Sequence, residues 1–222
     1  SGIYSWCHML VHYIIGSTVD YPDNLAHVLF VSTCNYGCHY CHNKDLKNMK
    51  EISLEKIQVI LGEYDNFVDH IVISGGEPTF EIDTTKRIID TFIDKYRIGI
   101  HTNGSFPDRL KSLFDYVDFI GMDLKGDEDT YKMIPGADFH AVCKSLEFLK
   151  DFRGRYEIRS TYYEPYFNAN TITNMIDILS NYGHNNLVVQ KFMDGIFRDT
   201  DKLPYYVNNH SDFVIHFKTM NY

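Results

Sequence analysis

Two rhythms of hydrophobic and polar positions alternate along the chain after residue 25. Short apolar runs such as "AHVLFVS", which begins at Ala26, have the length and composition of buried strands. Between these runs, apolar residues recur at helical spacing, as in "SLEKIQVILGEY", where Ser53 is a plausible N-cap. We predict six strands, at 26–32, 69–76, 97–104, 116–126, 155–163 and 185–192, and five helices between them, at 53–64, 84–96, 108–114, 140–152 and 171–182.

Regular alternation of strands and helices predicts an α/β fold with a parallel sheet. A complete eight-fold barrel takes about 250 residues, or about 30 per strand–helix unit. The segment 26–192 holds 167 residues, which is enough for five to six units. We therefore predict a partial, open (β/α)6 TIM-type barrel. A doubly wound open sheet has the same local pattern and remains an alternative.

The chain is expected to form one domain over residues 1–222. Residues 1–25 form an N-terminal extension with a short strand at "VHYIIG", 26–193 the core, and 194–222 a tail that ends in an edge strand at "FVIHFK". No apolar run approaches the roughly 20 residues that cross a bilayer, so we expect no membrane association.

Charge argues against a nucleic-acid partner. The formal net charge is −9, from 30 acidic and 21 basic residues. Proteins that bind nucleic acid neutralise phosphates with clustered Lys and Arg, and this sequence has no such cluster. A globular protein or a small molecule is the expected partner.

Three of the five cysteines stand close together, spaced C-x3-C-x2-C, at Cys34, Cys38 and Cys41. Disulfides within this loop would close very small rings and stabilise little, so reduced thiols of a cytosolic protein that bind metal are expected. His39 or His42 could complete a Cys3His zinc site. An iron–sulfur cubane normally takes four thiolates. Three thiolates leave one iron open to a substrate, and this is the interpretation we favour.

Polar residues lie at the carboxyl end of every predicted strand. The second strand ends in "SGGEP", the third in "HTNG" and the fourth in "MDLKG", while Arg159 and Gln190 lie on the fifth and sixth. Each motif alone is explained by turn chemistry or a surface ion pair. Their joint occurrence at the carboxyl ends of parallel strands, where ligands bind, predicts one site that contacts them all.

With the cysteine motif after the first strand and "GGEP" after the second, residues 12–193 resemble the radical S-adenosylmethionine (SAM) superfamily. The resemblance implies a [4Fe-4S] cluster and SAM as cofactors. In that family the open iron binds the methionine part of SAM, and one electron from the cluster releases a 5′-deoxyadenosyl radical that abstracts hydrogen.

The resemblance also implies roles for individual residues. The three cysteines of the motif would ligate the cluster, and Tyr40 would pack near the adenine. The loop of Ser74, Gly75, Gly76 and Glu77 would meet the amino group of SAM. The remaining expected SAM contacts are Thr102, Asn103, Asp123, Lys125, Arg159 and Gln190, with the carboxylate and ribose facing Asp123 and Lys125.

Within the superfamily, "CHYCHNKD" and "MDLKG" look like the activating enzymes of glycyl radical enzymes. The stretch "STVDYPDN" at 17–24 is similar to one found in activators of anaerobic ribonucleoside-triphosphate reductase, except that Asp23 replaces a glycine. His101 replaces an aspartate that contributes to a monovalent-cation site in related activators, which puts such a site in doubt here.

The expected function is therefore that of a radical SAM activase that forms a glycyl radical on a partner enzyme, and the expected partner is anaerobic ribonucleotide reductase. The expected electron donor is a flavodoxin- or ferredoxin-like protein. Because an open iron is oxygen-labile, an anaerobic cytoplasm is expected. One alternative is a small-molecule radical SAM enzyme such as a 7-carboxy-7-deazaguanine synthase-like enzyme, although His42 and Asn43 stand where that family has Asp and Thr. Another is a non-catalytic iron–sulfur or zinc module.

Overall fold

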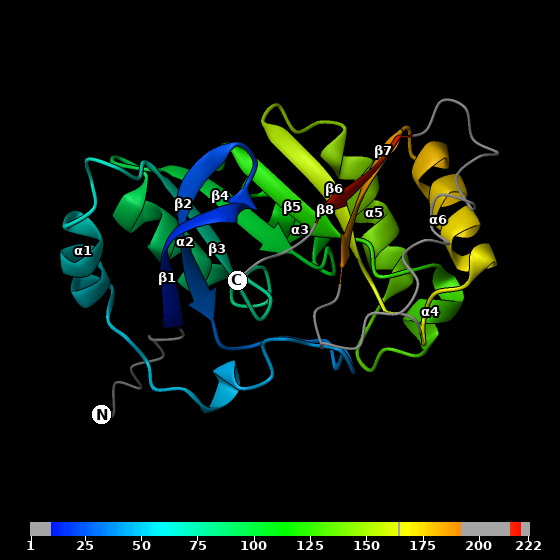
Figure 1. Ribbon diagram of the computed structural model, residues 1–222, viewed down its shortest axis with the longest axis horizontal. Coiled ribbons are helices and arrows are strands. Elements are labelled where there is room, and N and C mark those ends of the chain that lie inside the picture. The colour runs from blue at the N-terminus through cyan, green and yellow to red at the C-terminus, as the bar shows by residue number, and fades with distance from the viewer. Residues whose placement is uncertain (1–9, 164, 192–213, 219–222) are drawn as a thin grey trace.

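The computed structural model describes residues 10–163, 165–191 and 214–218 (Figure 1). Within them the strands are β1 Leu10–Tyr21, β2 Asn24–Val31, β3 His70–Gly75, β4 Arg97–Thr102, β5 Phe119–Asp123, β6 Arg155–Tyr162, β7 Asn186–Lys191 and β8 Val214–Lys218. The α-helices are α1 Leu54–Gly62, α2 Ile82–Phe92, α3 Pro107–Lys111, α4 Glu128–Lys132, α5 Phe139–Leu149 and α6 Ala169–Asn181, with a short 3-10 helix at Leu46–Asn48. No described helix is long and apolar enough to cross a membrane.

The eight strands form one sheet in sequential order, from β1 to β8. The first two strands are antiparallel, and each later strand pairs in parallel with the one before it. A doubly wound sheet reverses its strand order at a switch point, whereas this sheet never reverses. The predicted barrel-type progression is therefore confirmed. No ladder among the described residues joins β1 to β8, so the barrel is open.

Alternate residues of each strand face the helices. On β2, Leu29 and Val31 belong to the main core cluster, which also includes Ile57 and Leu61 of α1 and residues of α2, α3, α5 and α6. Because right-handed crossovers in a sequentially ordered sheet place the helices on one side, they share this layer. The largest apolar core therefore lies between the sheet and its helices.

The other residues of each strand face the inside of the open barrel. Near the amino ends of the strands this inner face is apolar, with Ala26, Val72 and Phe119 packed against Tyr21. Toward the carboxyl ends it becomes polar, because the period of two brings a polar side chain inward from each of five strands. These side chains are Ser74, His101, Asp123, Arg159 and Gln190.

Most differences from the predicted elements lie at their ends. The N-terminal strand has twelve residues rather than six, because it pairs along the whole of β2 as a hairpin. The helix α4 is absent from the prediction, since five residues are too few to show a period. The predicted edge strand in the tail is confirmed as β8. The fourth predicted strand ends at Asp123, so Lys125 lies in the loop after it.

Candidate active site

The three cysteines occupy the loop that follows β2, and all three are free thiols. Cys34 is exposed, while Cys38 and Cys41 are half-buried. The backbone N–H of Tyr36 donates to the Cys34 sulfur at 3.4 Å, and the Asn103 amide lies 4.0 Å from the same atom. Donors directed at a sulfur favour a thiolate there, which is the form that ligates iron.

Although Cys34 is exposed as a residue, desolvation of its sulfur raises the pKa of the thiol to about 11, against the hydrogen bond from Tyr36, which lowers it. The pKa of Cys38 is also raised by burial. The thiols of Cys34 and Cys38 are therefore protonated at neutral pH without metal, and metal binding must release their protons. Within the described ranges, no three Cys, His, Asp or Glu side chains converge on a single ion. A cubane takes its thiolates on separate irons and does not need that convergence.

The glycine-rich loop after β3 lies directly against the start of the cysteine loop. Gly76 N–H donates to the carbonyl of Val31 at 2.9 Å, and Glu77 N–H donates to the carbonyl of Thr33 at 2.6 Å. A Cβ on Gly76 would lie 1.8 Å from the Thr33 oxygen, so only glycine allows this approach. The two loops predicted to share a ligand are thus in backbone contact.

The Glu77 carboxylate is fully buried and bonded within the protein. One oxygen accepts from the Thr79 backbone and hydroxyl and from the Thr102 hydroxyl at 2.7 Å, and the other accepts from Asn103 N–H at 2.6 Å. Burial raises the pKa of Glu77 above its ordinary value, although these hydrogen bonds favour the anion. The carboxylate therefore joins the loops after β3 and β4. Contact between the Ser74–Glu77 loop and the SAM amino group remains a prediction.

A set of three charges lies at the ends of β5 and β6, with Arg159 buried and Asp123 and Lys125 half-buried. Asp123 contacts Lys125 Nζ at 3.1 Å and Arg159 Nη2 at 3.2 Å. Burial alone would raise the pKa of Asp123, but the two cations outweigh it and hold the pKa below its ordinary value. Burial would likewise lower the pKa of Lys125, but the Asp123 carboxylate holds it well above its ordinary value. These three groups form an ion-pair network that is partly shielded from solvent, with two positive groups around one carboxylate.

His101 lies between this charge set and β1. Its Nε2 atom is 2.8 Å from the carbonyl oxygen of Asp20 and 2.9 Å from Nη1 of Arg159. Asp20 is itself buried and accepts a hydrogen bond from the Ser17 hydroxyl at 2.5 Å. The 17–24 stretch thus contacts the site through Asp20. A monovalent-cation site at His101 remains untested.

Two buried donors on the inner face have no acceptor within the part of the chain that the structure describes. Neither Arg159 Nε nor Gln190 Nε2 has a hydrogen-bond partner among the described residues, although both side chains are more than nine-tenths buried. An unsatisfied buried donor costs about 1–3 kcal/mol, so such groups are expected where a ligand supplies the acceptor. The carboxylate and ribose oxygens of SAM are acceptors of this kind, and the residues fit that cofactor.

Tyr40 packs into an aromatic group between the cysteine loop and the segment after β6. Its ring centroid is 4.9 Å from that of Tyr163 and 5.5 Å from that of Tyr166. Tyr166 also places its hydroxyl 2.6 Å from Nδ1 of His39. Tyr40 thus belongs to a group of three tyrosine rings, and its packing near the adenine remains a prediction.

Two asparagines of the cysteine loop were not predicted as site residues. Asn35 accepts from the Asn103 amide at 3.1 Å and so joins the cysteine loop to the loop after β4. Asn43 donates to the carbonyl of Gly75 at 3.0 Å and joins the same loop to the end of β3. Their position among the cysteines is the only sequence signal that could have identified them. Both hold the loop in place through side-chain amides.

Comparison with known proteins agrees with this geometry. The family model of the Radical SAM superfamily matches residues 28–179. A Methanocaldococcus jannaschii protein provisionally named a glycyl-radical enzyme activating enzyme is 36% identical over 122 residues, which are 52% of this chain and 50% of that protein. The pyruvate formate-lyase-activating enzyme of Clostridium pasteurianum is 34% identical over 134 residues, 53% of each chain. The chain thus spans about half the length of these relatives.

Solved structures share the fold at low sequence identity. Streptococcus suis SuiB bound to the precursor peptide SuiA superposes with a TM-score of 0.66 at 15% identity, over 87% of this chain and 48% of SuiB. The enzyme anSMEcpe with bound AdoMet superposes with a TM-score of 0.59 at 18% identity, over 76% of this chain and 51% of that chain. The likeness confirms the fold predicted from the sequence.

Proposed function

This chain belongs to the radical SAM superfamily, whose cofactors are a [4Fe-4S] cluster and SAM, and from that premise we propose that it activates a glycyl radical enzyme. The observation that carries the proposal is the naming of its relatives as glycyl-radical enzyme activating enzymes and pyruvate formate-lyase-activating enzyme. When bound, the reduced cluster and SAM supply a 5′-deoxyadenosyl radical, which takes a hydrogen atom from the substrate. The substrate atom proposed here is the Cα of a glycine in a partner protein.

The site residues divide into two proposed roles. Cys34, Cys38 and Cys41 would hold the cluster, because all three are free and lie in one loop at the open end of the barrel. Around them, the loops after β3 and β4 would hold the methionine part of SAM. The charge set of Asp123, Lys125 and Arg159, together with Gln190 and Tyr40, would hold its carboxylate, ribose and adenine.

Anaerobic ribonucleotide reductase is the proposed partner, and a flavodoxin- or ferredoxin-like protein the proposed electron donor. Support for the partner comes from the 17–24 stretch, whose Asp20 lies against His101 at the rim of the site. An open barrel suits a protein substrate, because a loop of the partner can enter between the edges of the sheet.

The test is anaerobic reconstitution with iron and sulfide, followed by reduction in the presence of SAM and the anaerobic reductase of the same organism. We expect 5′-deoxyadenosine by chromatography and a glycyl radical signal on the reductase by electron paramagnetic resonance. Cys38→Ala should abolish both, because the cluster loses one of its three ligands. A partner with its radical glycine replaced by alanine is the matched control and should show no signal.

Other outcomes contradict the proposal in distinguishable ways. Formation of 5′-deoxyadenosine without a glycyl radical would indicate a small-molecule radical SAM enzyme. Uptake of a cubane without any deoxyadenosine would indicate a non-catalytic cluster. Binding of stoichiometric zinc alone would contradict the cofactor assignment.

A further inference from the structure

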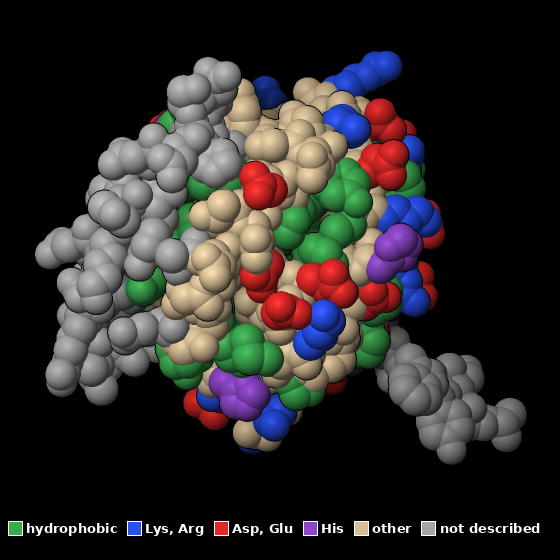
Figure 2. Space-filling view, turned by 90° about the vertical axis from the view of Figure 1, so that its right-hand side faces the viewer, with side chains coloured by type: hydrophobic (Ala, Val, Ile, Leu, Met, Phe, Trp, Pro, Cys, Tyr) green, Lys and Arg blue, Asp and Glu red, His purple; other side chains and the backbone are tan. Residues whose placement is uncertain are grey.

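A cavity of about 550 Å³ lies among α4, α5 and the end of α6, apart from the candidate active site. On the face shown in Figure 2, acidic side chains gather around a hollow with a hydrophobic floor. The floor of the cavity consists of Tyr131, Phe139, Cys143 and Tyr182. Its volume falls within the range of small-molecule sites, about 300–1,000 Å³, and is large for a single inserted side chain.

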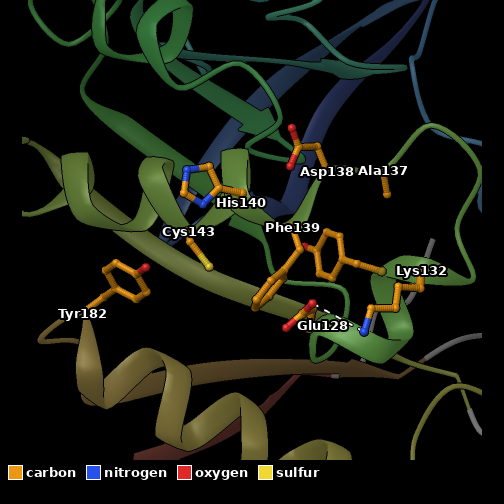
Figure 3. A pocket seen from close by; sticks show the side chains of 9 residues that line it. Glu128, Lys132, Ala137, Asp138, Phe139, His140, Cys143 and Tyr182 are labelled. Atoms are coloured by element: carbon orange, nitrogen blue, oxygen red, sulfur yellow. Dashed lines mark ion pairs between the residues drawn. The ribbon is translucent and has the colours of Figure 1, made fainter.

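The lining predicts the charge of a ligand. Three of the lining residues are aromatic, and the carboxyl groups of Glu128 and Asp138 stand at the rim. Figure 3 shows the Glu128 carboxylate beside the Phe139 ring, with Lys132 paired to it. That pair is 3.4 Å long and both side chains are 64% exposed, so it contributes little and a ligand cation can replace Lys132. Aromatic faces with carboxylates favour a flat organic cation.

Tyr131 forms a wall between this cavity and the candidate active site. It is 2% exposed, and its ring lies 5.3 Å from that of Phe139 on the cavity side. On the other side, its hydroxyl accepts from the backbone N–H of Lys125 at 3.1 Å, and its ring lies 6.5 Å from that of Tyr36 in the cysteine loop. One side chain therefore contacts the cavity floor, the loop that carries Lys125, and the cysteine loop.

A second contact joins the same two regions through the backbone. The connection from α4 to α5 carries Ala137 and Asp138 of the cavity rim. Two residues earlier, the carbonyl of Pro135 accepts from the N–H of Gly37, between the first two cysteines, at 2.8 Å. A ligand that packs against the rim therefore restrains the cysteine loop as well as Lys125.

We propose that this cavity is an effector site for a small organic cation with a flat aromatic body, and that its occupancy tightens the binding of SAM. A ligand that fills the floor holds Tyr131 and the α4–α5 connection in the arrangement that positions Lys125 and the cysteine loop. SAM binding then needs less ordering of these loops. By linkage, SAM must tighten the binding of the cation by the same factor.

Binding is tested first with a charge series on one molecular frame. Benzamidine, benzamide and benzoate are titrated into the reconstituted protein by calorimetry under anaerobic conditions. Benzamidine is expected to bind at least about fivefold more tightly than neutral benzamide, because the aromatic rings and the carboxylates attract its positive charge. Benzoate is expected not to bind. Equal affinity for all three, or no binding of benzamidine, overturns the proposal.

Variants then locate the site. Phe139→Leu and Glu128→Gln are each expected to weaken benzamidine several-fold, because one removes an aromatic face and the other a rim carboxylate. Glu63→Gln is the matched control, since Glu63 is an exposed carboxylate at the end of α1 and does not line the cavity. Thermal unfolding checks that each variant is folded. Benzamidine binding that is unchanged in both Phe139→Leu and Glu128→Gln places the ligand elsewhere and overturns the proposal.

Coupling is measured as the ratio of SAM dissociation constants without and with saturating benzamidine. We expect SAM to bind at least about threefold more tightly with benzamidine, within the usual range of coupling between two sites. Tyr131→Phe keeps the aromatic floor and loses only the hydroxyl on Lys125, so it should bind benzamidine normally and show a smaller ratio than the unaltered protein, because the contact of Pro135 with Gly37 still couples the two regions. A ratio of one in the unaltered protein overturns the effector assignment, whatever the enzyme does to a partner.

Discussion

Gly76 brings the two ligand loops of the candidate site into contact. The loop after β3 reaches the cysteine loop only because this residue has no side chain, and a Cβ would overlap the Thr33 carbonyl. Neighbouring hydrogen bonds from Gly76 and Glu77 to Val31 and Thr33 fix the distance. The position of Cys34, one residue after Thr33, therefore depends on a glycine more than 40 residues away in sequence.

Gly76→Ala should move the cysteine loop. We expect it to lower the free energy of unfolding by about 3 kcal/mol, as for an overpacked core, and to reduce the iron bound per chain after reconstitution. Urea unfolding and iron analysis measure the two effects. Gly62→Ala is the matched control: its Cβ would meet nothing nearer than 3.8 Å at the end of α1, so it should be neutral or stabilise slightly. Full iron uptake by Gly76→Ala would show that the loop tolerates the shift.

Among elements, the β1–β2 hairpin depends on a residue with unusual backbone geometry. Asp23 has φ of +63° and is the only described non-glycine residue with positive φ. It follows Pro22 in a two-residue turn, where proline suits the first position and positive φ favours glycine or asparagine at the second. The glycine that similar activators have at this position is explained in the same way, because glycine adopts positive φ without strain. The side chain also pairs with Arg155 at 2.8 Å, largely in solvent.

A substitution series at Asp23 separates the backbone from the ion pair. Asp23→Asn should leave stability within about 0.5 kcal/mol of the parent, because asparagine tolerates this geometry and an exposed pair contributes little. Asp23→Ala should lose about 1 kcal/mol, since alanine meets the full penalty of the left-handed region. Urea unfolding of the metal-free protein measures both. Equal losses in the two variants would assign the effect to the ion pair instead.

At the scale of the whole molecule, two buried histidines make stability depend on pH. His27 is fully buried on β2, and neither of its ring nitrogens has a hydrogen-bond partner among the described residues. Burial lowers the pKa of His27, against the attraction of Asp65. Burial also lowers the pKa of His184, which bonds Tyr156 and the carbonyl of Leu146. The unfolded chain therefore binds protons more readily than the folded one at these positions.

Stability should be greatest above pH 6.5, the ordinary histidine pKa, and should fall as pH drops below it. Each histidine contributes at most about 1.4 kcal/mol per pH unit. His27→Leu should reduce this dependence and stabilise the protein by about 1 kcal/mol at pH 7.5, because two unsatisfied nitrogens disappear. Urea unfolding at pH 5.5 and 7.5 measures both effects, with exposed His140→Gln as control. An unchanged pH dependence in His27→Leu would contradict this account.

The sequence by itself determined the order of strands and helices and the cysteine motif, because a period of two or of 3.6 shows which side of an element is buried. Chain length favoured an open barrel, but the doubly wound alternative has the same periodicity and was excluded only by the strand order of the sheet. The sequence also placed Asp123, Arg159 and Gln190 on the strands whose carboxyl ends form the site. Short helices such as α4 were not predicted, because a single turn is too short to show a period.

Only the tertiary structure decided which side chains meet. The Glu77 carboxylate bonds Thr102 and Asn103, about 25 residues away, and Arg159 bonds Asp123 and His101 from other strands. Such partners depend on strand register and loop path, which no local pattern encodes. The same holds for Tyr131, whose ring packs against Phe139 of the cavity and whose hydroxyl accepts from the N–H of Lys125. The residue types of the site can be read along the chain, but their contacts arise only when the sheet brings the loops together.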